Sequence, residues 1–332
     1  MSAFGLRLGG AQAQGKPEKS RLIVAVGDRT SLQQLPLTIA ERLGFFAGEG
    51  LDIEILDLGN GQRAQQAVME GAADVACGAF TGLFDPLARK HLLRAFLLLG
   101  RAPQIAFGVS KRALPAFKRV QELRGLRIAV AAPGSSAQLV AAVVLARAGL
   151  SLADVRLVEA GGVGAALQAV RSGQVDAIVH MEPVMTMLEL KGDIRIISDT
   201  RSLKGSLDVF GGAIPSTCMY APAQTVQNNV NTMQALANAV VHALKWLQTA
   251  GPSDLIKAVP ENYLLGDRGL YLAVFGKVRE SIALDGVIPD EGVKTVIRVL
   301  RKLDPTFDPE EIALERIYTN AFARKAKEKY RA

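Results

Sequence analysis

The chain has 332 residues, of which 49% are hydrophobic and 21% charged, so it can bury the cores of two ordinary domains and is too apolar to be disordered. Its net charge of +7 comes from scattered lysines and arginines, and aromatic residues make up 5%, whereas a nucleic-acid-binding protein typically carries a basic stripe with aromatics in it. No apolar run reaches the roughly 18–20 residues of a membrane-spanning helix. We therefore expect a globular protein of two domains with no nucleic-acid partner.

Residues 1–20 are expected to be a signal-peptide remnant or a disordered N-terminus. Ala11-Gln12-Ala13 matches the small-x-small pattern of a signal-peptidase site, and a polar segment follows it. The apolar stretch that normally precedes such a site is nearly missing, which points to a truncated or misassigned start. The alternative is a disordered cytoplasmic N-terminus. We interpret the pattern as that of an exported, periplasmic protein.

One structural unit occurs twice in the sequence. A strand–helix–strand–helix–strand pattern spans 21–82 and recurs at 126–184, where the blocks AVMEGAADVACG and AVRSGQVDAIVH occupy equivalent positions. In both blocks a helical pattern ends at a glycine and an aspartate leads into an apolar strand. Near-continuous apolar strands that alternate with helices are typical of parallel sheets covered on both faces. We predict an α/β protein of two lobes, each a mainly parallel sheet flanked by helices.

The chain is expected to cross between the lobes twice. The strand pattern FGVS follows the first repeat, the strand pattern FGGAIPSTCMYAP follows the second, and amphipathic helices that we assign to the first lobe come last. The predicted divisions are a first lobe at 21–103 and 213–332, a second lobe at 104–212, and hinges at 99–104 and 209–214.

A ligand site is expected between the lobes. Ligands of open α/β sheets bind beyond the carboxyl ends of the strands, so each lobe turns three loops toward a shared cleft. This layout is typical of a hinged binding protein that closes on a small molecule. The six predicted loops are 27–34, 59–62 and 78–82 in the first lobe, and 132–137, 161–165 and 180–184 in the second.

Several blocks in order resemble a known family. They are LPLTIAERLGFFAGEGLDIEI, with Gly-Phe-Phe and then Glu-Gly-Leu-Asp, followed by LRGLRIAVAAPGSS, GQVDAIVHMEP and DGVIPDEGV. From about residue 21 to its end, the chain is similar to the periplasmic substrate-binding proteins of ABC importers for nitrate, sulfonates and taurine, the NMT1/THI5-like group. The resemblance implies a two-lobed periplasmic-binding-protein-like fold, a small-molecule ligand in the cleft between the lobes, permease subunits as partners, and no catalysis. We expect a monomer without cofactor or metal.

The serine loop Ala132–Ala137 is the first candidate ligand contact. Free N–H groups and the dipole at a helix start favour an anionic group, and serine hydroxyls add donors. We therefore assign ligand contacts to Gly134, Ser135 and Ser136, the alternative being that one serine only caps the helix. A nucleotide-binding P-loop is disfavoured because the Gly-Lys-Ser/Thr sequence is absent.

In the first lobe, the loop GDRTSLQQ supplies further candidates. Arg29 can pair bidentately with a carboxylate or sulfonate, or lie solvated at the rim. Asp28 would repel an anion or bind a cationic ring nitrogen. Gln33 and Gln34 lie one turn into the helix, within reach of the cleft, and Asn60 of the second loop is a further expected contact.

In the remaining first-lobe segments, Thr81 is a predicted hydroxyl contact, and Phe80 is either a stacking surface or ordinary core. Arg101, near the first predicted hinge, can also contact the ligand. In the second lobe, Glu182 can accept from an amine or hydroxyl, or form a salt bridge that closes the lobes. Gly162 allows a close backbone approach to the ligand or simply a tight turn, and its neighbour Val163 is predicted to contact the ligand as well.

Two rival functions remain open. Some relatives on this fold are enzymes, a desulfinase and a pyrimidine synthase, so Cys77 can be imagined as a nucleophile with His91 or His180 as base. Against this, an apolar run such as DVACGAF makes Cys77 a buried, inert cysteine, and we expect Cys77 and Cys218 to be unpaired. A bilobal sensor coupled to DNA binding would need a helix-turn-helix segment, which the residues before Arg21 are too few to form.

Overall fold

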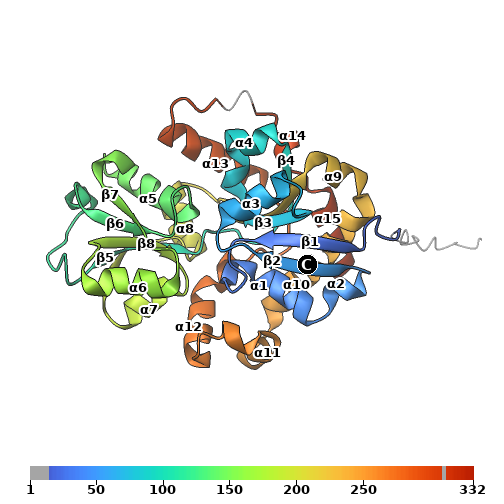
Figure 1. Cartoon of the computed structure of the whole chain (residues 1–332), viewed down its shortest axis with the longest axis horizontal. Coiled ribbons are helices and arrows are strands. Elements are labelled where there is room, and N and C mark those ends of the chain that lie inside the picture. Colours follow the sequence, from blue (N-terminus) through green and yellow to red (C-terminus); the bar gives the residue numbers. More distant parts are fainter. Residues whose placement is uncertain (1–14, 309–311) are drawn as a thin grey trace, which may run out of the picture.

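The computed structural model describes residues 15–308 and 312–332, which form two α/β lobes side by side (Figure 1). We call the part built on the sheet β2-β1-β3-β10-β4 lobe 1, and the part built on the sheet β7-β6-β8-β5-β9 lobe 2. The strands of lobe 1 are β1 (Arg21–Val26), β2 (Asp52–Asp57), β3 (Val75–Ala79), β4 (Leu93–Leu98) and β10 (Thr217–Pro222). Those of lobe 2 are β5 (Ile105–Ser110), β6 (Arg127–Val130), β7 (Arg156–Glu159), β8 (Ala177–Met181) and β9 (Ile194–Asp199).

The two sheets have the same topology, as the sequence repeat predicts. In lobe 1, β1 pairs in parallel with β2 and β3, and β10 runs antiparallel between β3 and β4. In lobe 2, β6 pairs in parallel with β7 and β8, and β5 runs antiparallel between β8 and β9. The reversed strand is in each case the one by which the chain arrives from the other lobe. The chain enters each sheet at the edge that faces the other lobe, where the parallel strands end, so the entering strand is antiparallel to them.

One side-chain contact repeats with the topology. The predicted aspartates Asp74 and Asp176 lie just before β3 and β8, each after a helix that ends at a glycine. The Asp74 carboxylate accepts a hydrogen bond of 3.0 Å from the backbone N of Ile23 in β1, and Asp176 accepts one of 2.9 Å from Arg127 in β6. In both lobes the aspartate therefore holds the third strand of the unit against the first, which confirms that the two blocks are equivalent.

Two strands of the structure have no counterpart in the sequence prediction. β4 and β9 lie at the outer edge of each sheet, beyond the reversed strand. Their sequences, LRAFLL and IRIISD, are a short apolar run and an alternating segment, the two strand patterns that are hardest to separate from a buried helix or a loop. The repeating unit is thus longer than predicted by one strand.

The helices cover both faces of the two sheets. Around lobe 1 lie α1 (Leu35–Arg42), α2 (Phe45–Gly48), α3 (Gly61–Met69), α4 (Pro86–Lys90), α9 (Ala223–Asn228), α10 (Val230–Thr249), α14 (Leu314–Ile317) and α15 (Ala321–Tyr330). Around lobe 2 lie α5 (Ser136–Arg147), α6 (Val163–Ser172), α7 (Val184–Leu190) and α8 (Leu203–Phe210). Short 3₁₀ turns are η1 (Leu32–Gln34), η2 (Phe80–Phe84), η3 (Val120–Leu123), η4 (Leu152–Asp154), η5 (Glu261–Tyr263) and η6 (Arg279–Ser281). None of the helices in the described residues is long and apolar enough to cross a membrane.

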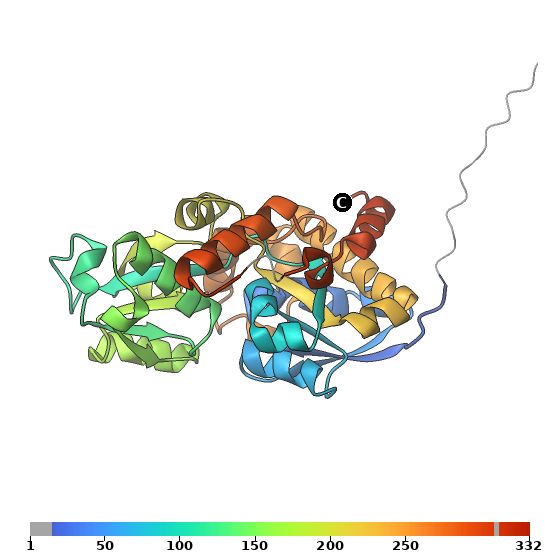
Figure 2. The same cartoon turned by 90° about the horizontal axis from the view of Figure 1, so that it is seen from above.

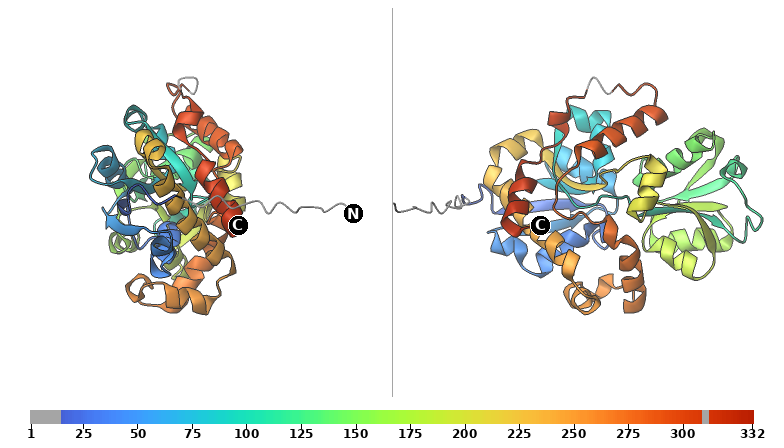
Figure 3. Two further views of the ribbon diagram at one scale, coloured as in Figure 1. Left: turned by 90° about the vertical axis from the view of Figure 1, so that its right-hand side faces the viewer. Right: turned by 180° about the vertical axis from the view of Figure 1, so that it is seen from behind.

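The C-terminal helices divide between the lobes. As predicted, α10 packs on lobe 1, where it contacts α1, α2 and α15; seen from behind, α15 lies over α10 at the end of lobe 1 that is remote from lobe 2 (Figure 3). The next helices are α11 (Pro252–Ala258), α12 (Arg268–Val278) and α13 (Asp290–Leu303). Seen from above, α13 reaches from lobe 1 over lobe 2 (Figure 2), and its Arg298 donates to the carbonyl of Gly211 at 3.0 Å. The assignment of α13 to lobe 1 alone is therefore incomplete.

The two segments that connect the lobes lie side by side. Leu99 N and Gly100 N both donate to the carbonyl of Thr217, at 2.8 and 3.0 Å, and Ser216 N donates to the carbonyl of Gly100 at 2.8 Å. These bonds place the outgoing and returning chains in one short ladder between the sheets.

The cysteines occupy neighbouring strands but opposite faces of the lobe 1 sheet. In the antiparallel pair β3–β10, Cys77 stands opposite Met219 and Cys218 opposite Gly78. Because opposed residues share a face and consecutive residues alternate, the two thiols point away from each other. Both cysteines are free and fully buried, which confirms the expectation that they are unpaired.

We therefore predict that both thiols stay unreactive until the protein unfolds. Ellman's reagent under non-reducing conditions is expected to detect two thiols per chain in guanidinium chloride and almost none within minutes in buffer, because both are buried and burial raises the pKa of each thiol. A disulfide would give no thiol in the denatured chain and would contradict the strand register.

Candidate functional site

The predicted loops of the two lobes meet at the lobe interface. The Ser31 hydroxyl of lobe 1 lies 4.0 Å from the Met181 sulfur of lobe 2. Nearby, Gln33 donates through Nε2 to the carbonyl of Pro103 in the connecting segment, at 2.7 Å. A Cβ placed on Gly134 would stand 2.3 Å from Nε2 of Gln62 in lobe 1. The carboxyl ends of the two sheets therefore face each other, and we place the candidate site between them.

The serine loop is shaped by local hydrogen bonds. Gly134 has a φ of +72°, a left-handed conformation that favours glycine. Its N donates to the side chain of Gln138 at 2.8 Å, and the Ser135 hydroxyl accepts from Gln138 N at 3.4 Å. Ser135 is thus the N-cap of α5, as in the alternative in which one serine only caps the helix. The Ser136 hydroxyl makes no hydrogen bond within the described residues and stands half-buried at the first position of the helix.

Three helices begin at this interface, one from lobe 1 and two from lobe 2. Their N-caps are Asn60 for α3, Ser135 for α5 and Gly162 for α6. The Asn60 side chain accepts from Arg63 N at 2.9 Å, whereas Gly162 offers no side chain and the next residue, Val163, is exposed. Each N-terminus carries unpaired backbone N–H groups and a partial positive charge of about half a unit. The interface therefore favours an anionic group.

Arg29 is held by the protein's own carboxylates. Its Nη2 lies 2.6 Å from both carboxylate oxygens of Glu41 on α1, and its backbone N donates to Asp57 at 3.1 Å. Partial burial acts to lower the pKa of Arg29, but the hydrogen bond with Glu41 and the charge of Glu41 outweigh it, so the pKa is raised. In this structure the bidentate partner expected from a ligand is supplied by Glu41.

Asp28 also has a structural role. Its carboxylate accepts from the N and the hydroxyl of Thr30, at 2.9 and 2.8 Å, in a turn that precedes η1. The role of Asp28 in this turn explains why a carboxylate lies beside the predicted site, and no cationic group on the ligand is needed to account for it.

Gln34 carries a buried polar atom with no partner. Its Nε2 donates to the carbonyl of Cys77 in the middle of β3, at 3.4 Å, while its Oε1 is buried and unbonded within the described residues. An unpaired buried acceptor is rare and costly, so it marks a place where a donor from outside the chain would be favourable.

The third loop of lobe 1 splits between core and interface. Phe80 is fully buried, with its ring edge-on to Phe84 at 5.7 Å and to Tyr318 at 6.4 Å. Its ring thus belongs to the core, which corrects the expectation of a stacking surface. Thr81 is half-buried in η2 and makes no hydrogen bond within the described part of the chain.

Arg101 fastens the connecting segment to η6. Its N donates to the carbonyl of Ser281 at 2.7 Å, and its Nε donates to the carbonyl of Glu280 at 2.8 Å. The guanidinium therefore supports the crossing between the lobes and is turned toward η6 in this structure.

Glu182 is a buried salt-bridge residue inside lobe 2. Its carboxylate accepts from the N and the hydroxyl of Thr186, at 3.0 and 2.9 Å, and from Arg201 Nη1 at 2.7 Å. Arg201 also binds Asp199 at 2.5 Å, and both side chains of the Glu182–Arg201 pair are almost fully buried. The expected salt bridge is present, but it does not itself join the lobes, and the carboxylate is occupied by protein donors.

The charge network continues to lobe 1 through residues that the sequence analysis did not single out. Glu189 on α7 accepts from Arg201 at 3.2 Å and also from Lys277 on α12. Burial acts to raise the pKa of Glu189, but its hydrogen bond with Lys277 and the charge of Arg201 lower it overall. This ion pair connects the two lobes. Gln62 was missed as well, although it lies in a predicted loop.

The environment of Cys77 does not support a nucleophile. The residue is fully buried, and burial raises the pKa of its thiol. His180 lies in the other lobe, 3.2 Å from the carbonyl of Ala160 and 3.3 Å from that of Met181, and burial lowers its pKa. His91 is exposed at the end of α4. Neither histidine is hydrogen-bonded to Cys77 among the described contacts.

Two matching lobes, joined by two adjacent segments and facing each other with their loops, define the class of proteins with the periplasmic-binding-protein fold. Residues 31–251 match the family described as NMT1/THI5 like, and the chain belongs to this family. A solved protein of Bordetella bronchiseptica RB50 is 47% identical, with a TM-score of 0.90 over 96% of this chain and 100% of that one.

Two more distant structures share the fold. The alkanesulfonate-binding protein SsuA of Xanthomonas axonopodis pv. citri, bound to MOPS, is 17% identical and has a TM-score of 0.68 over 91% of this chain and 99% of its own. The periplasmic nitrate-binding protein NrtA of Synechocystis PCC 6803 is 15% identical, with a TM-score of 0.69 over 95% and 90%.

The contact between Gly134 and Gln62 can be tested by substitution. Gly134→Ala is expected to destabilise the protein by roughly 1–2 kcal/mol because of the left-handed backbone, and by a small further amount because its Cβ displaces the flexible end of Gln62. Gly125→Ala is the matched control, since Gly125 has a φ of +77° and open space around its Cβ position. In urea unfolding, Gly134→Ala should lower the free energy of unfolding more than Gly125→Ala does. This difference should vanish when Gln62 is also replaced by alanine. An equal cost for both glycines would show that the loops do not meet.

The ion pair between the lobes gives a second prediction. Lys277→Met should weaken the contact of α12 with α7 and so favour arrangements with more open lobes, by up to about 1 kcal/mol. Small-angle X-ray scattering should then show a larger radius of gyration. High salt should have the same effect on the unsubstituted protein. Because the pKa of Glu189 is lowered, the pair is intact at neutral pH and lost as the pH falls below the ordinary glutamate range. Lys294→Met removes an ion pair within α13 and serves as the control. An equal radius for both variants would contradict a role in holding the lobes.

Proposed function

We propose that this protein is the solute-binding component of an ABC import system. It captures a small organic solute with a carboxylate, sulfonate or similar group between its two lobes and delivers it to permease subunits in the membrane. The observation that carries the proposal is the convergence of three helix N-termini, from both lobes, on one interface. A site made in this way binds an anionic group without any basic side chain.

The charged side chains near the interface support this mode of binding. Arg29, Asp28 and Glu182 each have partners within the protein, so the ligand is held mainly by N–H groups, hydroxyls and amides. Ser136, Gln34 and Thr81 are polar side chains with free capacity within the described residues, and we place them against the ligand. The remaining contacts of the proposed site are Gln33, Asn60, Gly134, Ser135, Gly162 and Val163.

Closure follows from the division of the site between the lobes. A ligand stabilises the closed arrangement only to the extent that it contacts both lobes, and here α3 belongs to one and α5 and α6 to the other. We place the hinges at the connecting segments, 99–104 and 209–214, between a lobe at 21–103 and 213–332 and a lobe at 104–212.

Partners and location follow from the family. The related structures named for alkanesulfonate and nitrate binding support a small anionic ligand, and a periplasmic location of the NrtA relative supports an exported protein. Ala11-Gln12-Ala13, the proposed signal-peptidase site, lies outside the described residues. We further propose that the protein acts as a monomer. We also propose that it acts without catalysis, since Cys77 is fully buried and neither His91 nor His180 is hydrogen-bonded to it among the described residues.

The proposal is tested with a substitution that separates binding from folding. Ser136→Asp adds a negative charge at the first position of α5, which favours the helix but repels an anion bound there. Differential scanning fluorimetry with taurine, methanesulfonate, benzoate and nitrate should show a Tm that rises with the concentration of at least one ligand, and Ser136→Asp should weaken that ligand at least tenfold.

Ser253→Asp makes the same change in the first turn of α11, on an exposed residue outside the six loops, and should leave binding unaltered. Stabilisation by a neutral or cationic compound alone, or equal binding by Ser136→Asp, would contradict the proposed site. A ligand found chemically altered by mass spectrometry would favour the enzyme alternative.

A further inference from the structure

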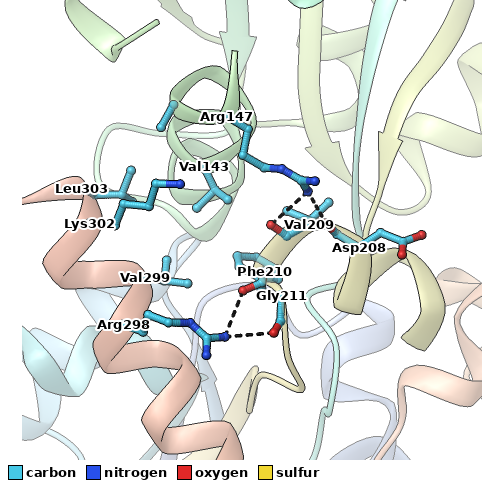
Figure 4. Close-up of a pocket in the computed structure, with 11 residues that line it drawn as sticks. Val143, Arg147, Asp208, Val209, Phe210, Gly211, Arg298, Val299, Lys302 and Leu303 are labelled. Atoms are coloured by element: carbon cyan, nitrogen blue, oxygen red, sulfur yellow. Dashed lines mark hydrogen bonds between the residues drawn. The ribbon is translucent and has the colours of Figure 1, made fainter. Parts of the chain in front are cut away.

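A second hollow lies away from the proposed ligand site, between α5, α8 and α13 (Figure 4). It has a volume of about 310 Å³, which is near the lower end of the roughly 300–1,000 Å³ of small-molecule sites. On α5 it is lined from Val143 to Arg147, whereas the proposed anion site is at Ser136. At 1.5 Å per helical residue the two sites are roughly 10–16 Å apart along the helix.

One part of the lining of this hollow, which we call the α13 pocket, is apolar. Val143 of α5, Val209 and Phe210 of α8, and Val299 and Leu303 of α13 contribute to its lining. These side chains give a hydrophobic tail a surface to cover, at roughly 25 cal/mol for each Å² removed from water.

Three cationic side chains stand around these apolar walls. Arg147 donates through one nitrogen to the carbonyls of Asp208 and Val209, and Arg298 donates through one nitrogen to the carbonyls of Phe210, at 3.4 Å, and Gly211, at 3.0 Å. The carbonyls at the C-terminus of α8 thus orient both guanidinium groups, whose other nitrogens make no hydrogen bond within the described part of the chain.

The charge of the pocket is positive. Lys302 makes no hydrogen bond or ion pair within the described residues, and its side chain extends from α13 toward Val143, above Val299 (Figure 4). The partial negative charge of the α8 C-terminus offsets about half a unit of the three positive charges. Among the described residues, Asp208 is the one carboxylate in the lining, and its side chain points away from Lys302 and Arg298 (Figure 4).

We propose that the α13 pocket binds a small amphipathic anion, a carboxylate with a short alkyl tail. The carboxylate lies among Arg147, Arg298 and Lys302, and the tail covers the valines and Phe210. Because α5 and α8 belong to lobe 2 while α13 extends from lobe 1, occupation of the pocket favours the arrangement in which α13 rests on lobe 2. The site would therefore be coupled to the relative position of the lobes.

The experiment uses octanoate as the probe and isothermal titration calorimetry as the readout. Octanoate should bind the unsubstituted protein saturably, and octylammonium, with the same tail and the opposite charge, should not. Lys302→Glu should weaken octanoate at least tenfold. Arg301→Glu makes the same change in charge at the neighbouring exposed residue of α13, which does not line the pocket, and should alter binding less than threefold. Lys302→Gln removes the charge without reversing it, so its affinity for octanoate should lie between those of Lys302→Glu and Arg301→Glu.

Ser136→Asp distinguishes the two sites. Binding of octanoate that is lost in Ser136→Asp and kept in Lys302→Glu would place the probe between the lobes and overturn the proposal. Absence of saturation at millimolar octanoate, equal binding of octylammonium, or equal effects of Lys302→Glu and Arg301→Glu would also overturn it. Binding by the α13 pocket does not depend on a ligand between the lobes, so failure of either proposal leaves the other intact.

Discussion

The short ladder between Leu99, Gly100, Ser216 and Thr217 is the constraint on which the arrangement of this protein depends. It fixes the outgoing and returning chains against each other, with each chain entering the opposite sheet as a reversed strand. A reversed strand has its start at the carboxyl edge of its parallel neighbours. Since both connecting segments leave from that edge, the two carboxyl edges have to face each other. The meeting of the ligand loops is thus a consequence of topology before any side chain is considered.

Charge pairing within the protein then determines what the interface offers. Arg29 and Glu182 are the two ionic groups that a reader of the sequence would assign to a ligand, and each is bound to a protein partner. A buried charge without a partner costs several kcal/mol, so a carboxylate as deeply buried as Glu182 requires Arg201 whether or not a ligand is present. What remains for recognition are helix starts and uncharged donors, which cost little in an empty site because water can satisfy them.

The features that sequence reasoning predicted are local ones. The serine loop, the glycines that end α3 and α6, and Asp74 and Asp176 are readable because cap, turn and strand entry are determined within a few residues. The partners of the charged residues were not readable in the same way. Glu41 on α1 meets Arg29 from 12 positions away, but Lys277 meets Glu189 from 88 positions away, and no pattern in the chain indicates that contact. The choice between core and stacking surface for Phe80 stayed open for a related reason: its place beside Tyr318 depends on the C-terminal segment returning to lobe 1.

The lobes are joined by interactions of unequal strength, and this inequality bears on movement. The ladder consists of backbone hydrogen bonds that a rotation about the connecting segments can preserve. The Lys277–Glu189 pair is about one-third exposed on each side, and a pair of this kind contributes about 0–1 kcal/mol. The Ser31–Met181 and Gln62–Gly134 contacts join flexible or small groups, and Arg298 spans to lobe 2 by hydrogen bonds to carbonyls. An opening of the lobes would therefore break these contacts and keep the backbone hydrogen bonds of the ladder. A difference of a few kcal/mol between two arrangements is of the size that a small ligand can reverse by touching both lobes.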